Sequence, residues 1–130
     1  MKVPSLATIV LTALMGCLAA CLLGCGSKAS PKADATELER VFGLKAGAPA
    51  SDEPTAAGLA SRAVAALRAQ EWPKAVVLLE QIRKGRGLTA EQSRAVHNAT
   101  ANALGRVIEQ ADKGDADAQR LLEARKKSAK

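Results

Sequence analysis

A long apolar segment opens the chain and contains or precedes all of its cysteines. The run covers residues 3–23, follows a single Lys2, and carries Cys17, Cys21 and, just beyond it, Cys25. A basic start followed by an apolar core is typical of an export signal, although about 21 apolar residues also suffice to cross a bilayer. Because the rest of the chain has no cysteine, no disulfide can support its fold, and packing of secondary structure must do so.

The residues ahead of the last two cysteines resemble the lipobox of bacterial lipoproteins, in which Leu and small residues precede the acylated cysteine. Residues 18–21 (LAAC) and 22–25 (LLGC) both carry this pattern. Cys25 is the favoured anchor because the polar segment 26–31 follows it, whereas cleavage before Cys21 would leave two leucines at the mature N-terminus. Cys21, Cys17 and an uncleaved membrane anchor remain as alternatives.

The lipobox resemblance implies a bacterial envelope protein held in a lipid bilayer by diacylglycerol and acyl groups on the anchor cysteine. Each buried acyl methylene contributes about 0.8 kcal/mol to membrane binding. Gly26 follows Cys25, in place of the Asp that resembles an inner-membrane retention signal, so an outer-membrane, periplasm-facing location is expected if the cell is Gram-negative. The expected domains are a signal peptide at 1–24, a tether at 25–54 and a folded domain at 55–130.

The expected tether is rich in Ala, Ser, Pro, Gly and Lys, which is linker composition. One stretch differs, because Leu38, Val41, Phe42 and Leu44 follow helical spacing and predict a short amphipathic helix at about 34–44. Phe42 is the only phenylalanine. It either docks this helix on the main domain, which we favour, or presents an apolar contact to a partner.

Four helices are predicted after the tether, at about 55–70, 73–84, 90–113 and from 116 onward, which makes the fold class all-α. Thr55 or the preceding Pro54 can start the first, Thr89 and Gln92 resemble a capping box for the third, and Asp115 can cap the fourth. Helix spacing predicts the following inward residues: Leu59, Ala63, Val64 and Leu67; Ala75, Val76, Leu78, Leu79 and Ile82; Val96, Ala99, Ala103, Leu104, Val107, Ile108 and Ala111; Ala118, Leu121 and Leu122.

Two helical hairpins in series suggest an internal repeat at an offset of 43 residues. The matching residues are Ala75, Leu78, Leu79 and Glu80 with Ala118, Leu121, Leu122 and Glu123, and Val64 with Val107. Segment 69–80 (AQEWPKAVVLLE) resembles the turn and second helix of a tetratricopeptide (TPR) repeat, and this similarity covers about 30 residues, from Ala56 to Arg83. It implies TPR-like helical hairpins and a role in protein interaction. The TPR-like turn favours Trp72 as a buried packing residue over an exposed binding residue.

Composition and motifs favour a non-enzymatic protein with no catalytic residues, metal or cofactor. The chain has a single Trp, a single Phe and no Tyr, so it offers few aromatic side chains on which nucleic-acid bases could stack. No nucleic-acid partner is therefore expected. His97 is the only histidine and has no ligand residues at helical spacing. The acidic residues Asp112, Asp115 and Asp117 lack EF-hand spacing and are interpreted as helix-end charges.

Two functions are compatible with these features. The first is an interaction module whose groove is lined by the first and third of the four helices and binds an envelope protein or a second copy of the chain. The second is a structural lipoprotein or spacer with no specific ligand. The folded region is small and Ala-rich, and such a core rarely supplies more than about 3 to 5 kcal/mol, which favours a partner that covers an open face.

Overall fold

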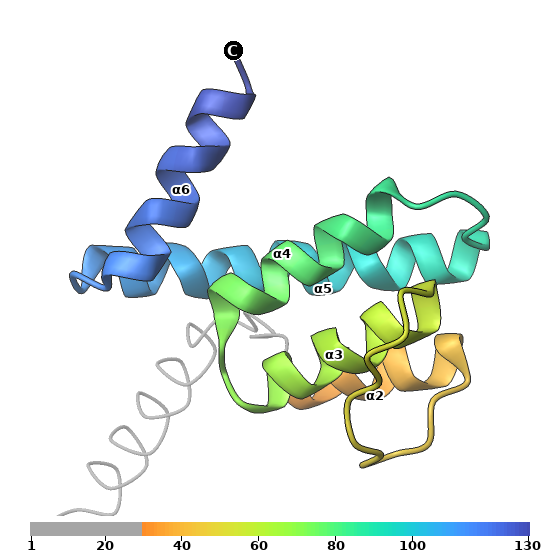
Figure 1. Ribbon diagram of the computed structural model, residues 1–130. Coiled ribbons are helices and arrows are strands. Elements are labelled where there is room, and N and C mark those ends of the chain that lie inside the picture. The colour runs from red at the N-terminus through yellow and green to blue at the C-terminus, as the bar shows by residue number, and fades with distance from the viewer. Residues whose placement is uncertain (1–29) are drawn as a thin grey trace, which may run out of the picture.

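The computed structural model describes residues 30–130, and all regular structure within that range is helical. Figure 1 shows the helices in order along the chain. They are α2 (Pro31–Phe42), α3 (Ala56–Arg68), α4 (Trp72–Lys84), α5 (Ala90–Asp112) and α6 (Ala116–Ser128). The all-α prediction is therefore confirmed for this range. The candidate anchors Cys17, Cys21 and Cys25 lie outside the described residues.

Helix starts follow the predicted capping residues. The Thr55 hydroxyl accepts a hydrogen bond from the Gly58 amide at 3.1 Å, and the Asp115 carboxylate accepts one from the Ala118 amide at 2.8 Å. At the start of α5, Thr89 and Gln92 form both hydrogen bonds of a capping box. Each bond satisfies an amide that the first helical turn would otherwise leave without a partner.

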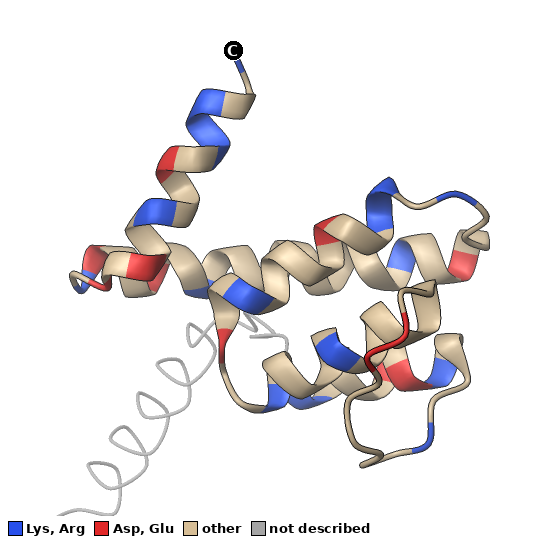
Figure 2. Cartoon of the chain, in the orientation of Figure 1, with Lys and Arg blue, Asp and Glu red and all other residues tan. Residues whose placement is uncertain are grey.

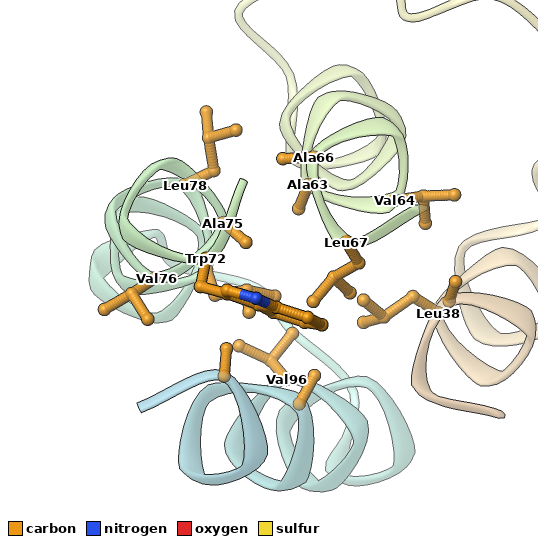
Figure 3. Packing of buried hydrophobic residues seen from close by; sticks show 14 of the residues in the cluster. Leu38, Ala63, Val64, Ala66, Leu67, Trp72, Ala75, Val76, Leu78 and Val96 are labelled. Carbon is orange, nitrogen blue, oxygen red and sulfur yellow. The ribbon is translucent and has the colours of Figure 1, made fainter. Parts of the chain in front are cut away.

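Four helices enclose the hydrophobic core. Helices α2 and α4 each pack against both α3 and α5. Figure 3 shows apolar side chains from these helices directed into the space between them. The largest fully buried side chains are Leu38, Leu67, Leu79, Ile82, Val76, Val96 and Val107. Because many of the remaining core residues are alanines, the helix backbones can approach closely while each residue buries little area.

Helix α2 is part of this core. It begins at Pro31, three residues before the expected start, and Ala35 and Leu38 are 0% exposed. Proline suits the first helical turn because its missing N–H would have had no partner there. In the structure this helix lies against the main domain, and Phe42 is half-buried against the core. The packed core accordingly includes α2, with Ala35 as its first buried residue, whereas the sequence suggested a folded domain from Thr55 onward. Helix α2 belongs to the core because it packs against both α3 and α5.

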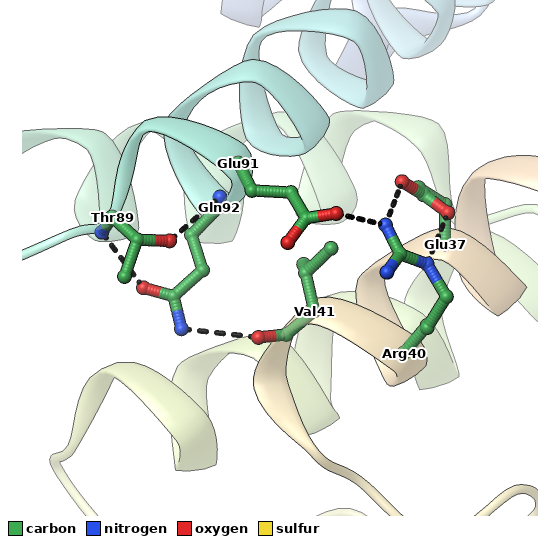
Figure 4. A network of polar contacts seen from close by, with 6 residues as sticks. All are labelled: Glu37, Arg40, Val41, Thr89, Glu91 and Gln92. Atoms are coloured by element: carbon green, nitrogen blue, oxygen red, sulfur yellow. Dashed lines mark hydrogen bonds and ion pairs between the residues drawn. The ribbon is translucent and has the colours of Figure 1, made fainter.

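A polar network joins the C-terminal end of α2 to the start of α5 (Figure 4). The Arg40 guanidinium donates to Glu37 within α2 at 2.7 Å and to Glu91 of α5 at 2.6 Å. The Gln92 amide donates to the Val41 carbonyl at 3.1 Å. Gln92 thus caps its own helix and also binds the end of α2.

Two acidic side chains, Glu39 and Asp34, hold the rest of α2. Glu39 is 6% exposed and accepts a hydrogen bond from Arg68 of α3 at 2.8 Å, with the Gly47 amide as a weaker donor at 3.3 Å. The Asn102 side chain of α5 donates to both carboxylate oxygens of Asp34, at 3.0 and 3.1 Å. A buried carboxylate is stabilised when it is paired and hydrogen-bonded, so these contacts fix the position of α2 as well as its burial.

Helix α6 extends away from the four-helix core (Figure 1). It packs on α5 and to a smaller extent on α4, and Ala118 is its only buried residue. Leu121 and Leu122 are half-buried, and Arg125 forms an ion pair with Glu80 of α4. The inward position predicted for Ile108 is wrong, because this side chain is 49% exposed. One residue rotates a helix by about 100°, so Ile108 turns away from the side on which Val107 is covered.

Candidate docking surface

The two aromatic candidates of the sequence both lie in the packing. Trp72 is 8% exposed, and Figure 3 shows its indole directed into the space between the helices. Phe42 is half-buried and packs against the same core. In this arrangement Trp72 stabilises the α3–α4 hairpin, and little of its surface is accessible to a partner.

The residues that could bind a metal ion stay apart in the part of the chain that the structure describes. His97 is exposed on α5, and residues 30–130 contain no cluster of three side chains able to hold a metal ion. Within the acidic group near the last turn, Asp115 caps α6 and Asp117 pairs with Arg120 at 3.1 Å. These acidic residues therefore act at helix ends, as their sequence positions indicated.

The surface between α3 and α5, which the sequence suggested as a binding groove, is occupied by α2. These are the first and third of the four predicted helices, and α2 packs against both of them. The occupation is tight, because Leu38 and Ala35 are fully buried there and Glu39 is almost so. A partner could use that surface only after α2 had left it, so an accessible site must lie elsewhere.

An open groove lies on the other side of α4, between α4, α6 and the edge of α3. Its volume is about 500 Å³. The apolar part of its lining is Pro73, Val77 and Leu78 of α4 with Leu121 of α6. Val77 is 42% exposed and is one of two large apolar side chains that the described part of the chain exposes, the other being Ile108. The divergence of α6 from α4 leaves this groove uncovered.

The other side chains that line the groove are polar or charged. Arg62, Lys74 and Arg120 contribute positive charge, Asp117 contributes negative charge, and Gln81 completes the lining. Lys74 pairs with Glu71 at 2.8 Å, and Arg120 pairs with Asp117. All four side chains are at least half exposed to solvent. Exposed pairs of this kind contribute only about 0 to 1 kcal/mol, so their cations can be shared with a ligand.

Arg62 differs from these two cations. It forms no ion pair with any residue between 30 and 130. Figure 2 shows in addition that basic residues predominate along α6, which forms one side of the groove. The groove therefore combines an apolar part, the floor, with a mainly positive part, the border. The floor consists of Pro73, Val77, Leu78 and Leu121, and the border of Arg62, Lys74, Arg120 and Asp117.

The sequence held a signal for Val77 that the helical pattern did not use. Residues 76–79 are four consecutive apolar residues. A helix that buries Val76, Leu78 and Leu79 on one side must direct Val77 about 100° away from Val76, toward the opposite side. What the sequence could not provide is the direction of α6, which decides whether Val77 is covered.

A smaller cavity of about 300 Å³ lies near the start of α2. Its lining includes Pro31, Gln70, Arg106 and Gln110, and the Gln110 Oε1 atom is buried with no hydrogen-bond partner. Most of this lining is polar or charged. It lacks the exposed apolar side chain that distinguishes the groove beside α4.

Comparison with known proteins leaves the chain without an assigned family: no family description, curated protein or solved structure matches it. The interpretation of the groove therefore depends on its own chemistry. Within residues 30–130, no helix has both the length and the apolar character needed to cross a membrane.

Proposed function

We propose that this chain is a lipid-anchored envelope protein whose helical domain is a non-enzymatic protein–protein interaction module. The anchor is Cys25, with Cys21 as the alternative, and the covalent acyl groups are its only non-protein component. The observation that carries the interaction role is the groove between α4 and α6, where Val77 is 42% exposed beside Leu78 and Leu121. Exposed apolar surface with a polar border is characteristic of interaction sites.

We propose further that the hairpins α3–α4 and α5–α6 are TPR-like repeats. Supporting this, the inward residues Ala75, Leu78, Leu79 and Ile82 of α4 have their counterparts, 43 positions later, on the packed side of α6. Ala118 is fully buried, whereas Leu121, Leu122 and Arg125 are half-buried. In a stacked repeat each helix pair is covered by the next one, and α6 has no following helix within the described residues.

A short connection would join the anchor to this domain. Only residues 26–30 separate Cys25 from Pro31, where α2 begins. At no more than about 3.6 Å per residue they span less than about 20 Å. A domain anchored at Cys25 would remain at the membrane surface and would meet partners that also lie there. This differs from the long flexible tether that the sequence suggested.

The alternative function is a structural lipoprotein or spacer with no specific ligand. The largely polar exterior of α6 favours it, because Ala118 is the only buried residue of that helix. An uncleaved single-pass anchor is the alternative for the N-terminal segment. The two functions differ in whether the groove beside Val77 is covered by a partner in the cell.

One experiment on the producing cell tests the proposal. A photoreactive benzoylphenylalanine is placed at Val77, and separately at Ala101, an exposed position on α5 outside the groove. We expect a discrete crosslinked protein from position 77 and none from position 101. Equal labelling at both positions, or at neither, would support the spacer function instead.

The anchor is tested on the same membrane preparation by intact mass and by the N-terminal peptide. A mature chain that begins at acylated Cys25 or Cys21 supports the lipoprotein assignment. A chain that retains Met1 would contradict it and would favour the single-pass anchor. This measurement is independent of the crosslinking result, so location and interaction can be judged separately.

A further inference from the structure

The geometry of the groove between α4 and α6 points to a particular class of partner: we propose that it binds an acidic segment of another protein that carries a large apolar side chain. This inference rests on the proposed interaction function and specifies the chemistry of its partner. Three observations support it, namely the exposed apolar floor, the excess of positive charge around it, and the charge of the chain as a whole.

The floor supplies the apolar contact. Val77 is exposed and lines the groove together with Pro73 and Leu78 of α4 and Leu121 of α6. The space of about 500 Å³ is large enough for one or two side chains of a peptide but small compared with a standard protein–protein interface. A single segment with one apolar anchor fits this space better than a broad flat surface does.

The border supplies the charge preference. Arg62, Lys74 and Arg120 line the groove against a single carboxylate, Asp117. Arg62 has no acidic partner among the described residues, and the other two cations are held only by exposed neighbours three residues away. A carboxylate that enters the groove gains charge-assisted hydrogen bonds, which are stronger than neutral ones, whereas a basic segment would be repelled.

The charge of the chain argues against a second copy as the occupant. The net charge is +6, so two copies repel each other. Within α2, the buried carboxylate of Glu39 is already paired with Arg68 and is not accessible to the groove of another copy. A partner from outside the chain, with the opposite charge, is the complement of this surface.

The test uses two fluorescent peptides of about 12 residues with leucines at helical spacing. The charged positions between the leucines are all glutamate in one peptide and all lysine in the other. Fluorescence anisotropy measures their binding to the full-length, detergent-solubilised protein. We expect the acidic peptide to bind at least about tenfold more tightly than the basic one, and its affinity to fall as salt screens the charges.

Three variants locate the binding. Val77→Ser should weaken the acidic peptide about threefold or more, since it removes exposed apolar surface from the floor. Arg62→Glu and Arg86→Glu change the net charge equally, but only Arg62 lines the groove, whereas Arg86 lies in the exposed loop after α4. We expect Arg62→Glu to weaken binding about tenfold and Arg86→Glu to leave it within about twofold.

Several results would overturn the inference. Equal binding of both peptides would remove the charge preference, and equal weakening by Arg62→Glu and Arg86→Glu would show attraction to net charge without a site. A protein dimer that dissociates in Val77→Ser would make a second copy the occupant. If a specific crosslink from position 77 persisted while the acidic peptide failed to bind, the interaction function would stand and the acidic class of partner would fall.

Discussion

The two end helices of the described region, α2 and α6, are attached to the rest of the protein in opposite ways. Helix α2 lies between α3 and α5, with Ala35 and Leu38 fully buried and Glu39 at 6% exposure. Helix α6 has similar length but buries only Ala118 and diverges from the body (Figure 1). Local helix formation is therefore a poor guide to how firmly a segment is held, because most helix stability in proteins comes from packing.

The difference also separates structure from accessible surface. Helix α2 fills the surface that α3 and α5 share, and so removes it as a binding site. Helix α6 packs less on α4 than on α5, forms the Arg125–Glu80 ion pair with α4, and leaves the groove beside Val77 open. A firmly docked helix completes the core, whereas a loosely docked one creates an edge where a partner can bind. Four experiments test or refine this comparison.

The largest expected effect comes from truncating the apolar residue at the centre of each end helix. Leu38→Ala should lower the free energy of unfolding by about 3 kcal/mol, since a fully buried leucine leaves a cavity. Leu122→Ala should cost about 1 kcal/mol, because Leu122 is half-buried and its surroundings can readjust. Urea denaturation followed by the fluorescence of Trp72, the only tryptophan, measures both. Equal losses would contradict the different attachment of the two helices.

Hydrogen exchange should resolve the same difference without any substitution. Amides in α2 are expected to exchange with the slow group of the core, because α2 opens only when the core does. Amides in the second half of α6 should exchange at least about tenfold faster, by local fraying. The measurement is exchange followed by mass spectrometry of peptides from 31–42 and 119–128. Protection of α6 at the level of α2 would show that a further contact holds it.

Loss of the contact between α6 and α4 should have a smaller effect. Arg125→Ala removes the ion pair with Glu80, and pairs near the surface contribute about 1 kcal/mol or less. We expect the unfolding midpoint to change little while exchange in α6 accelerates. As the matched control, Lys126→Ala removes a neighbouring exposed charge that has no ion-pair partner among the described residues. A large loss of global stability in Arg125→Ala would place α6 within the core.

The helices were readily predicted from the sequence because their signals are local. Thr55, Thr89 with Gln92, and Asp115 mark helix starts within three residues of the groups they cap. All the α4 residues that were predicted to face inward are buried. These features need no knowledge of distant parts of the chain, since capping and helical periodicity act within one or two turns.

The parts that were missed depend on long-range contacts. Asp34 meets Asn102, and Glu39 meets Arg68, across 68 and 29 residues. Nothing in the composition of 26–54 signals these partners, so the segment resembled a tether. Whether Val77 is covered likewise depends on where α6 lies. The candidate site was therefore beyond sequence reasoning, because it is defined by the angle between two helices.

The smallest expected effect is a pH dependence confined to α2. Partial burial raises the pKa of the Asp34 carboxyl, and the hydrogen bond from Asn102 opposes this only in part. The folded state therefore holds the Asp34 proton more firmly than the unfolded state does, so this group's contribution to stability falls as pH rises through its folded pKa. Asp34→Asn keeps an acceptor for Asn102 and cannot ionise.

Between about pH 3 and pH 6, Asp34→Asn should gain stability relative to the original chain by less than about 1 kcal/mol, because solvent screens a half-exposed charge. Exchange of the α2 peptide, corrected for intrinsic rates and referred to the α6 peptide, measures the change where it arises. Asn102→Ala removes the bond that lowers the pKa of Asp34, so it should steepen the dependence. If Asp34→Asn and the original chain responded identically to pH, the Asp34 carboxyl would not contribute to the docking of α2, and apolar burial and the remaining polar contacts alone would distinguish α2 from α6.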